Sequence, residues 1–177
     1  MTPAIIRQER PEDYQAVSQV IEAAFRTLEI SDHTEHLMVD RLRHSPAFIP
    51  ELSLVATSAH EIVGHILLSN IHLQDGADSY TSLALAPVSV LPSWHGKGIG
   101  SHLILEAHRI ARKMGFTSVI LLGHPEYYPR FGYRPASSFG ISLPFEVPDE
   151  NCMALELLEG ALTDVKGMVI YPKEFFE

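Results

Sequence analysis

The sequence has little of several features that would each point to a particular class of protein. Its 177 residues include a single cysteine, Cys152, which excludes an internal disulfide and agrees with a reducing compartment. No apolar run approaches the roughly 18 residues that a membrane-spanning helix needs. Basic residues number 13 against 22 acidic ones, and the net charge of −9 disfavours broad electrostatic binding to nucleic acid or to an anionic membrane.

The start of the chain, MTPAIIRQERPEDY, also lacks the apolar core of a secretory signal peptide, so we expect a cytoplasmic protein. Its length favours a single domain over residues 1–177. The oligomeric state stays open, and a homodimer is compatible with the sequence. His33 and His36 have a spacing that suits a shared metal, but no cysteine or carboxylate set completes a site, so we expect no metal.

Hydrophobic periodicity and turn residues predict one α/β domain with a mixed sheet. Helices are expected over about 11–26, with Pro11 in its first turn, and over 34–44. Strands are expected at 52–57, 61–73, 82–90 and 116–122, with a polar loop over 74–79 and later candidates in MALELL and GMVIYP.

The most informative segment is residues 87–105, PVSVLPSWHGKGIGSHLIL. Gly96, Gly98 and Gly100 precede an amphipathic helix whose apolar stripe is Leu103, Ile104, Ala107, Ile110, Ala111 and Met114, with Gly115 as its C-cap. Glycines allow a close backbone approach, and a helix N-terminus favours an anion, so the segment is suited to a phosphate or pyrophosphate. Neither G-x-G-x-x-G nor G-x-x-x-x-G-K-[ST] is present, which argues against a dinucleotide or nucleoside-triphosphate site.

Pro87 lies inside the strand expected at 82–90, where it cannot donate a hydrogen bond to a neighbouring strand. An interior proline indicates a bulge, or a split between this strand and its neighbour. A split exposes backbone groups that a ligand can use.

The segment HGKGIG resembles the acetyl-coenzyme A signature of the GNAT superfamily of N-acetyltransferases, with His95 where Gln or Arg is usual. A second motif, YYPRFGYRPA, resembles the family's Tyr-x-x-x-Gly-Phe pattern near the start of the last helix: Tyr128 precedes Gly132 by four residues, and Tyr133 is the aromatic after it. The two motifs together are similar to a bacterial branch, the YhbS-like N-acetyltransferases, and the resemblance spans nearly the whole chain.

This resemblance implies a mostly antiparallel sheet with a splayed strand pair, flanked by helices. It implies direct acetyl transfer from acetyl-CoA to a primary amine of a small molecule or protein. The backbone of Val88, Ser89 and Val90 would bind the pantetheine arm. The residues implied at the pyrophosphate are His95, Gly96, Lys97, Gly98, Ile99, Gly100 and Ser101. Tyr128 would be the general acid that protonates the departing thiolate, while Tyr127 packs into the core.

Several assignments stay open at the level of sequence. The general base is His124, Glu126 or water, unless the amine arrives neutral. The carboxylates of Glu29, Asp32 and Glu35 either recognise a cationic amine or form a solvated face. A longer acyl donor is not excluded. The rival function is a coenzyme A-binding or acyl-CoA-binding sensor, or an interaction module without catalysis.

Overall fold

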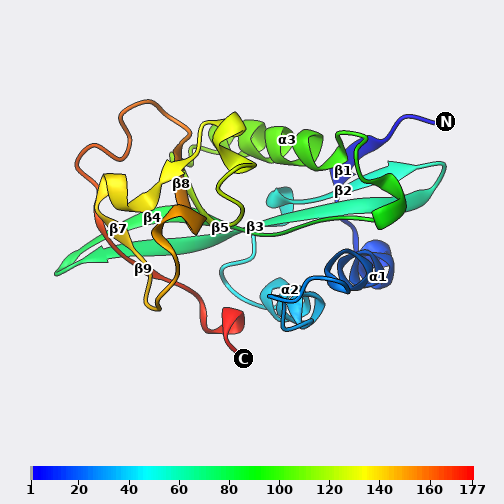
Figure 1. The fold of residues 1–177 in the computed structure, drawn as a ribbon, viewed down its shortest axis with the longest axis horizontal. Helices are drawn as coiled ribbons and strands as arrows, with labels where there is room; N and C mark the ends of the chain where they lie inside the picture. The colour runs from blue at the N-terminus through cyan, green and yellow to red at the C-terminus, as the bar shows by residue number, and fades with distance from the viewer. Residues whose placement is uncertain (1) are drawn as a thin grey trace. The chain divides into compact units, whose positions relative to one another are not determined.

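A nine-stranded sheet is the central element of the computed structural model, which describes residues 2–177 (Figure 1). Hydrogen-bonded neighbours follow the order β1-β2-β3-β4-β5-β8-β6, and β9 pairs with β3 and β7. The strands are β1 Ile5–Gln8, β2 Ser53–Ser58, β3 Glu61–Asp75, β4 Asp78–Val90, β5 Ser118–Leu122, β6 Arg134–Pro135, β7 Ile141–Ser142, β8 Cys152–Glu156 and β9 Gly167–Ile170. The pairings of β4 with β5 and of β7 with β9 are parallel, and most others are antiparallel, which confirms the predicted mixed α/β class.

Three α-helices accompany the sheet in the described part of the chain: α1 Tyr14–Phe25, α2 Glu35–Arg43 and α3 Ile99–Lys113. The first predicted helix opens as a short 3-10 turn, Pro11–Asp13, in which the Asp13 carboxylate accepts a hydrogen bond from the Arg10 backbone N–H. Gly115 ends α3 as expected, with φ +91° and its N–H bonded to the carbonyl of Arg112 at 3.0 Å. Met114, expected on the apolar stripe, is exposed beyond the end of the helix.

The prediction of a polar loop over 74–79 is wrong. Strand β3 continues to Asp75 and β4 begins at Asp78, so only Gly76 and Ala77 form the turn between them. Gly76 has φ +59°, which suits a tight turn between strands. Backbone pairing does not require apolar side chains, and Gln74 is paired with β9 although its side chain is polar.

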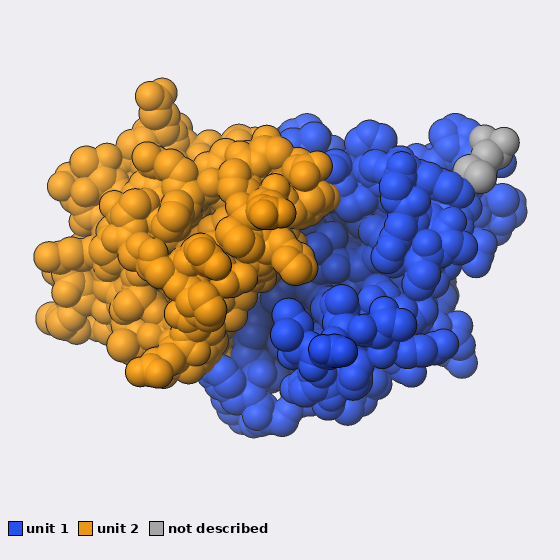
Figure 2. Space-filling view, viewed as in Figure 1, with its two compact units in different colours: residues 1–69, 86–110, 173–177 blue, residues 70–85, 111–172 orange. Residues whose placement is uncertain are grey.

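The chain divides into two compact units (Figure 2). The first comprises residues 1–69, 86–110 and 173–177, and the second comprises residues 70–85 and 111–172. Within the first unit, α1 and α2 cover one face of the strands and α3 covers the other (Figure 1). The core beneath α1 and α2 consists of Val17, Val20, Ile21, Val39, Leu42, Val55, Ile62 and Leu67.

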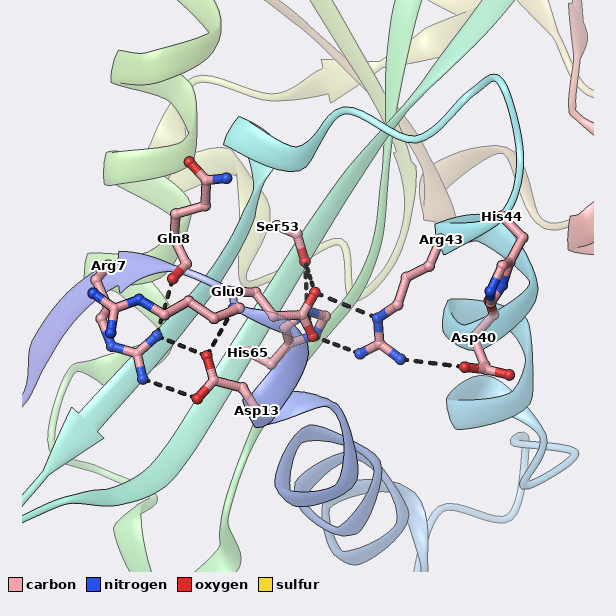
Figure 3. Close-up of polar contacts among 10 residues, drawn as sticks. Arg7, Gln8, Glu9, Asp13, Asp40, Arg43, His44, Ser53 and His65 are labelled. Atoms are coloured by element: carbon pink, nitrogen blue, oxygen red, sulfur yellow. Dashed lines mark hydrogen bonds and ion pairs between the residues drawn. The ribbon is translucent and has the colours of Figure 1, made fainter.

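A charged cluster is buried in the first unit (Figure 3). The carboxylate of Glu9 accepts a hydrogen bond of 2.5 Å from Arg43 and one of 2.7 Å from the Ser53 hydroxyl. His65 Nε2 lies 3.1 Å from Ser53 Oγ. The side chains of Glu9, Arg43 and His65 are 1%, 4% and 0% exposed. Because buried charges need such partners, the cluster connects α2 to the end of β1, the start of β2 and the interior of β3.

The network also fixes the protonation of His65. Ser53 donates its only proton to Glu9, so its oxygen accepts from His65 Nε2–H, and Nδ1 carries the lone pair. Nδ1 is buried, and no described residue bonds to it. Burial, and secondly the charge of Arg43, lower the pKa of His65 to about 3, so the ring is neutral at physiological pH.

Across residues 2–177, no helix combines the length and the apolar character that crossing a membrane requires. The second unit is built on β5 and β8, whose antiparallel register runs from Ser118 opposite Glu156 to Leu122 opposite Cys152. Arg112 connects the end of α3 to this sheet through a hydrogen bond of 2.9 Å to the carbonyl of Leu157.

Candidate functional site

The end of β4 parts from its parallel neighbour, as the proline in this strand predicts. The register of β4 with β5 covers only Leu83 and Ala84, whereas β4 continues to Val90. The other edge of the strand stays attached to β3, because the Leu91 N–H donates to the Val63 carbonyl at 2.9 Å. Pro87 therefore lies in the part of β4 that has left its pairing with β5.

Side chains alternate along this open segment. Val88 and Val90 are half-buried, while Ser89 is buried and its hydroxyl has no partner among the described residues. Within residues 88–90, the backbone groups that point to the edge no longer paired with β5 can bond to a ligand with amide-like donors and acceptors, apart from the Val90 carbonyl, which lies 3.0 Å from His95 Nε2. All three residues were candidates from the sequence.

The glycine segment follows in the same unit. After a 3-10 turn at Pro92–Trp94, Gly96 and Gly98 adopt φ of +76° and +78° before α3 begins at Ile99. A Cβ at either position would meet nothing within 4 Å. Glycine is therefore favoured at both positions by the left-handed backbone conformation and not by a lack of space for a side chain. Gly100 differs, because it lies inside the first turn of α3.

The first turn of α3 presents backbone donors. The His102 N–H donates to the Gly98 carbonyl at 3.0 Å and makes the first hydrogen bond of the helical pattern. The backbone N–H groups of the residues before His102 lie in the first turn, where the helix itself offers no acceptor. Ile99, Gly100 and Ser101 supply these amides, at the positive end of a 15-residue helix. An anion, such as a phosphate group, is the ligand that this arrangement favours.

The polar side chains of the glycine segment contact the protein itself. His95 Nε2 lies 3.0 Å from the carbonyl oxygen of Val90, which connects the segment back to the open end of β4. The ammonium of Lys97 lies 4.5 Å from the centre of the Trp94 ring, a cation–π contact at the surface. Lys97 thus places a positive charge beside the positive end of α3.

Gly64, on β3, helps to position the start of α3, and the sequence did not single it out. A Cβ there would lie 3.1 Å from Ile99 Cγ2, 3.1 Å from Leu103 Cδ1 and 3.2 Å from the carbonyl oxygen of Ser89. The start of α3 can approach the sheet this closely only because position 64 has no side chain. The available signal was a glycine inside EIVGHILL, an otherwise apolar strand.

Tyr128 belongs to the second unit and is 8% exposed. Its ring makes edge contacts with Tyr127 at 5.0 Å and with Tyr133 at 5.8 Å between centroids. It also lies so close to Gly123 that a Cβ at that position would overlap the ring. Burial, and secondly the neighbouring Tyr127, raise the pKa of Tyr128 to about 12, so the phenol keeps its proton at neutral pH.

Two expectations about this motif are wrong. Tyr127 was expected to be the packed tyrosine, but it is the more exposed of the pair, because the turn directs Tyr128 against Gly123. The motif does not open an α-helix either. It forms a short 3-10 turn, Tyr128–Phe131, which Gly132 ends with φ +97°.

The remaining candidates are His124, Glu126 and the carboxylates between α1 and α2. His124 and Glu126 have exposed side chains in the turn before Tyr128, and the His124 carbonyl accepts the Tyr127 N–H at 3.1 Å. Asp32 accepts hydrogen bonds from Thr34, which lower the pKa of its carboxyl.

The histidine pair considered as a metal site, His33 and His36, lines one pocket together with Glu22 and Glu35. His36 faces Glu22 at 3.6 Å, and residues 2–177 contain no group of three histidine, cysteine or carboxylate side chains that would hold a metal ion. Cys152 is buried, and its thiol pKa is raised to about 11, chiefly by burial. It therefore lacks the thiolate character of a nucleophile.

Comparison with known proteins extends the similarity over most of the chain. Residues 15–133 match the acetyltransferase (GNAT) family. The uncharacterized N-acetyltransferase YjhQ of Escherichia coli K12 is 35% identical over 123 residues, which are 68% of this chain and 68% of YjhQ. The uncharacterized N-acetyltransferase YhbS of the same strain is 26% identical over 172 residues, which are 97% of this chain and 98% of YhbS.

Two solved structures share the fold. The crystal structure of E. coli YhbS in complex with CoA has a TM-score of 0.89 and 25% identity, covering 100% of this chain and 94% of that chain. A GNAT family acetyltransferase from Brucella melitensis, crystallised in complex with acetyl-CoA, has a TM-score of 0.81 and 33% identity over 99% of both chains. These similarities confirm the predicted fold and its likeness to YhbS.

Proposed function

Because the chain belongs to the GNAT acetyltransferase family, we propose that it transfers an acetyl group from acetyl-CoA to a primary amine of a small molecule or protein. The observation that carries this proposal is the open end of β4, which leads directly into two left-handed glycines and the N-terminus of α3. Residues 1–177 would act as one acetyltransferase domain. The complexes of the two structural relatives with CoA and acetyl-CoA support the choice of coenzyme.

The coenzyme is proposed to bind along β4 and the glycine segment. Backbone groups of Val88, Ser89 and Val90 would bond to the amides of the pantetheine arm. The pyrophosphate would lie against the backbone of residues 95–101, where the helix N-terminus and Lys97 favour negative charge. The ring of His95 contacts the Val90 carbonyl oxygen, so its side chain would support the position of the glycine segment more than it would contact the coenzyme.

The reaction we propose is a direct attack. The neutral amine forms a bond to the thioester carbonyl carbon, the carbon–sulfur bond breaks, and the amine proton leaves to water, His124 or Glu126. The thiolate is the group that Tyr128 would stabilise. A phenol with pKa about 12 is a weaker acid than a thiol with pKa about 8.5, so the proposed contribution of Tyr128 is a hydrogen bond donated to the sulfur as its charge develops, and the released thiolate takes its proton from solvent.

The coenzyme site is tested by a matched pair of glycine variants. Gly98→Ala and Gly76→Ala impose a similar backbone strain, because both positions have positive φ and open space around them. Strain of this kind costs about 1–2 kcal/mol in each variant. We expect only Gly98→Ala to weaken acetyl-CoA binding, by tenfold or more in calorimetry. Equal affinity in the two variants would contradict this placement of the pyrophosphate.

The catalytic role is tested by mass-spectrometric acetyl transfer against a panel of amines. Tyr128→Phe is expected to lower kcat by about 10–1,000-fold, at or below the range typical of a general acid, with little change in acetyl-CoA affinity. The control is Tyr127→Phe in the same turn, which should keep its kcat. Unchanged turnover in Tyr128→Phe across pH would remove this residue from the mechanism.

The same assay separates the rival function. Thermal stabilisation by acetyl-CoA, combined with no turnover on any amine, would identify a coenzyme-binding sensor or interaction module in place of an enzyme. The absence of stabilisation by any coenzyme A species would overturn the coenzyme assignment itself.

A further inference from the structure

The second unit contains a pocket that none of the residues assigned to coenzyme binding or proton transfer lines. Its volume is about 590 Å³, within the range of roughly 300–1,000 Å³ typical of small-molecule sites. The pocket lies between β7, the loop over 143–149 and the first residue of β8. Most of its wall is apolar, from Ile141, Leu143, Phe145 and Val147.

The charges on this wall have one sign. Glu146 and Asp149 line the pocket, and no lysine, arginine or histidine is among the residues that do so. Ser137 and Ser142 add hydroxyl groups that can accept or donate. An anion would be repelled by the two carboxylates, whereas a cation would gain from both.

The loop that forms this wall is conformationally restricted. Its sequence, LPFEVPD, places Pro144 and Pro148 on either side of residues 145–147, and each proline fixes its own φ. The Phe145 ring stacks on Tyr171, with centroids 6.0 Å apart and an angle of 19° between planes. At the end of the loop, the Asn151 N–H donates a hydrogen bond of 3.0 Å to the Pro148 carbonyl. A wall that is already ordered loses little entropy when a ligand binds.

Cys152 forms part of the pocket lining and is 6% exposed. Its thiol pKa is raised to about 11 by burial and by Asp149, so the thiol is neutral at physiological pH. A neutral sulfur adds a polarisable, apolar contact and leaves the two carboxylates as the charged groups of the site.

We propose that this pocket binds a small organic ammonium ion whose apolar body packs against Phe145 and Val147 while its cationic head lies beside Glu146 and Asp149. The apolar wall selects against small hydrated cations, and the carboxylates select against neutral and anionic ligands of the same shape. Binding here does not require acetylation, so the pocket is a ligand site in addition to the proposed acetyl transfer.

The test uses the full chain and three aromatic ligands of similar size: benzyltrimethylammonium, benzyl alcohol and benzoate. The quaternary ammonium has no N–H and cannot be acetylated, so its binding is independent of turnover. In an amide NMR titration we expect benzyltrimethylammonium to shift the signals of residues 143–149 and 152. We expect it to bind at least tenfold more tightly than benzyl alcohol, with no shifts from benzoate.

A pair of charge variants locates the cation. The double variant Glu146→Gln, Asp149→Asn should weaken benzyltrimethylammonium binding at least tenfold, whereas Glu150→Gln, an exposed neighbour outside the lining, should leave it unchanged. Equal binding of the three ligands, shifts outside this loop, or an unaffected double variant would each overturn the proposal.

Discussion

Glu9 and Asp40 both form ion pairs with Arg43, but they do so in different surroundings. The Glu9 carboxylate is 1% exposed and its closest contact with Arg43 is 2.5 Å, whereas Asp40 is 64% exposed and lies 3.6 Å away. Removing a buried partner leaves an uncompensated charge in the protein interior, whereas an exposed partner is replaced by water. The same guanidinium therefore allows a direct comparison of a buried and an exposed pair.

We predict that Glu9→Ala lowers the free energy of unfolding by about 3–5 kcal/mol. Asp40→Ala should change it by less than about 1 kcal/mol. Urea unfolding followed by circular dichroism at pH 7 measures both values. Similar losses in the two variants would show that Arg43 does not depend on its buried carboxylate.

At the scale of single residues, the sequence could indicate chemistry but not burial. Gly96 and Gly98 were recognisable because closely spaced glycines directly before a helical pattern indicate a backbone conformation that other residues rarely adopt. Glu9, Ser53 and His65 were not, because each looks like an ordinary polar residue in its local context. Only the pairing of distant segments brings them together, and no short-range pattern reports that pairing.

At the scale of elements, the contact between α3 and β3 depends on the missing side chain of Gly64. A Cβ there would approach Ile99, Leu103 and the Ser89 carbonyl at 3.1–3.2 Å, closer than such contacts normally permit. The start of α3 would have to move away from the sheet to accommodate it. This helix start is also the proposed pyrophosphate site, so packing and binding should change together.

We predict that Gly64→Ala destabilises the protein by about 1–3 kcal/mol, the usual cost of overpacking, and weakens acetyl-CoA binding. Leu103→Val removes one of the atoms that the new Cβ would meet. The double variant should therefore lose less stability than the sum of the single variants in a thermal unfolding cycle. Strict additivity would mean that the crowding is relieved elsewhere.

Helices were more predictable than strand ends. The boundaries of α1 and α2 follow from apolar spacing and from Pro11, which are local signals. The ends of β3 and β4 carry polar side chains and were mistaken for a loop, because their pairing is a backbone property. The burial of Tyr128 in place of Tyr127 likewise depends on a 3-10 turn that the motif does not specify.

At the scale of the whole molecule, His65 makes folding sensitive to acid. Its pKa is about 3 in the folded protein, against an ordinary value of 6.5. Between these two values the unfolded chain binds more protons than the folded one. This contribution to stability is therefore complete above about pH 6.5 and is lost as the pH falls toward 3.

We expect the free energy of unfolding to fall by a few kcal/mol between pH 6.5 and 4, since each pKa unit corresponds to about 1.4 kcal/mol. His65→Gln should flatten this dependence even if it is less stable at pH 7, whereas His72→Gln, at an exposed position, should preserve it. Urea titrations across this pH range provide the slopes. Parallel slopes in the wild type and His65→Gln would assign the acid sensitivity to other groups.

The open end of β4 has a consequence for pairing with other chains. A strand edge with free backbone groups can template the addition of another chain, which is how many sheet proteins begin to aggregate. Here the opening is confined to the last residues of the strand, and Pro87 removes one donor at its base. The segment beyond the pairing with β5 covers residues 85–90 and lacks one backbone donor, so it is a poorer template for a foreign strand than a continuous edge of the same length.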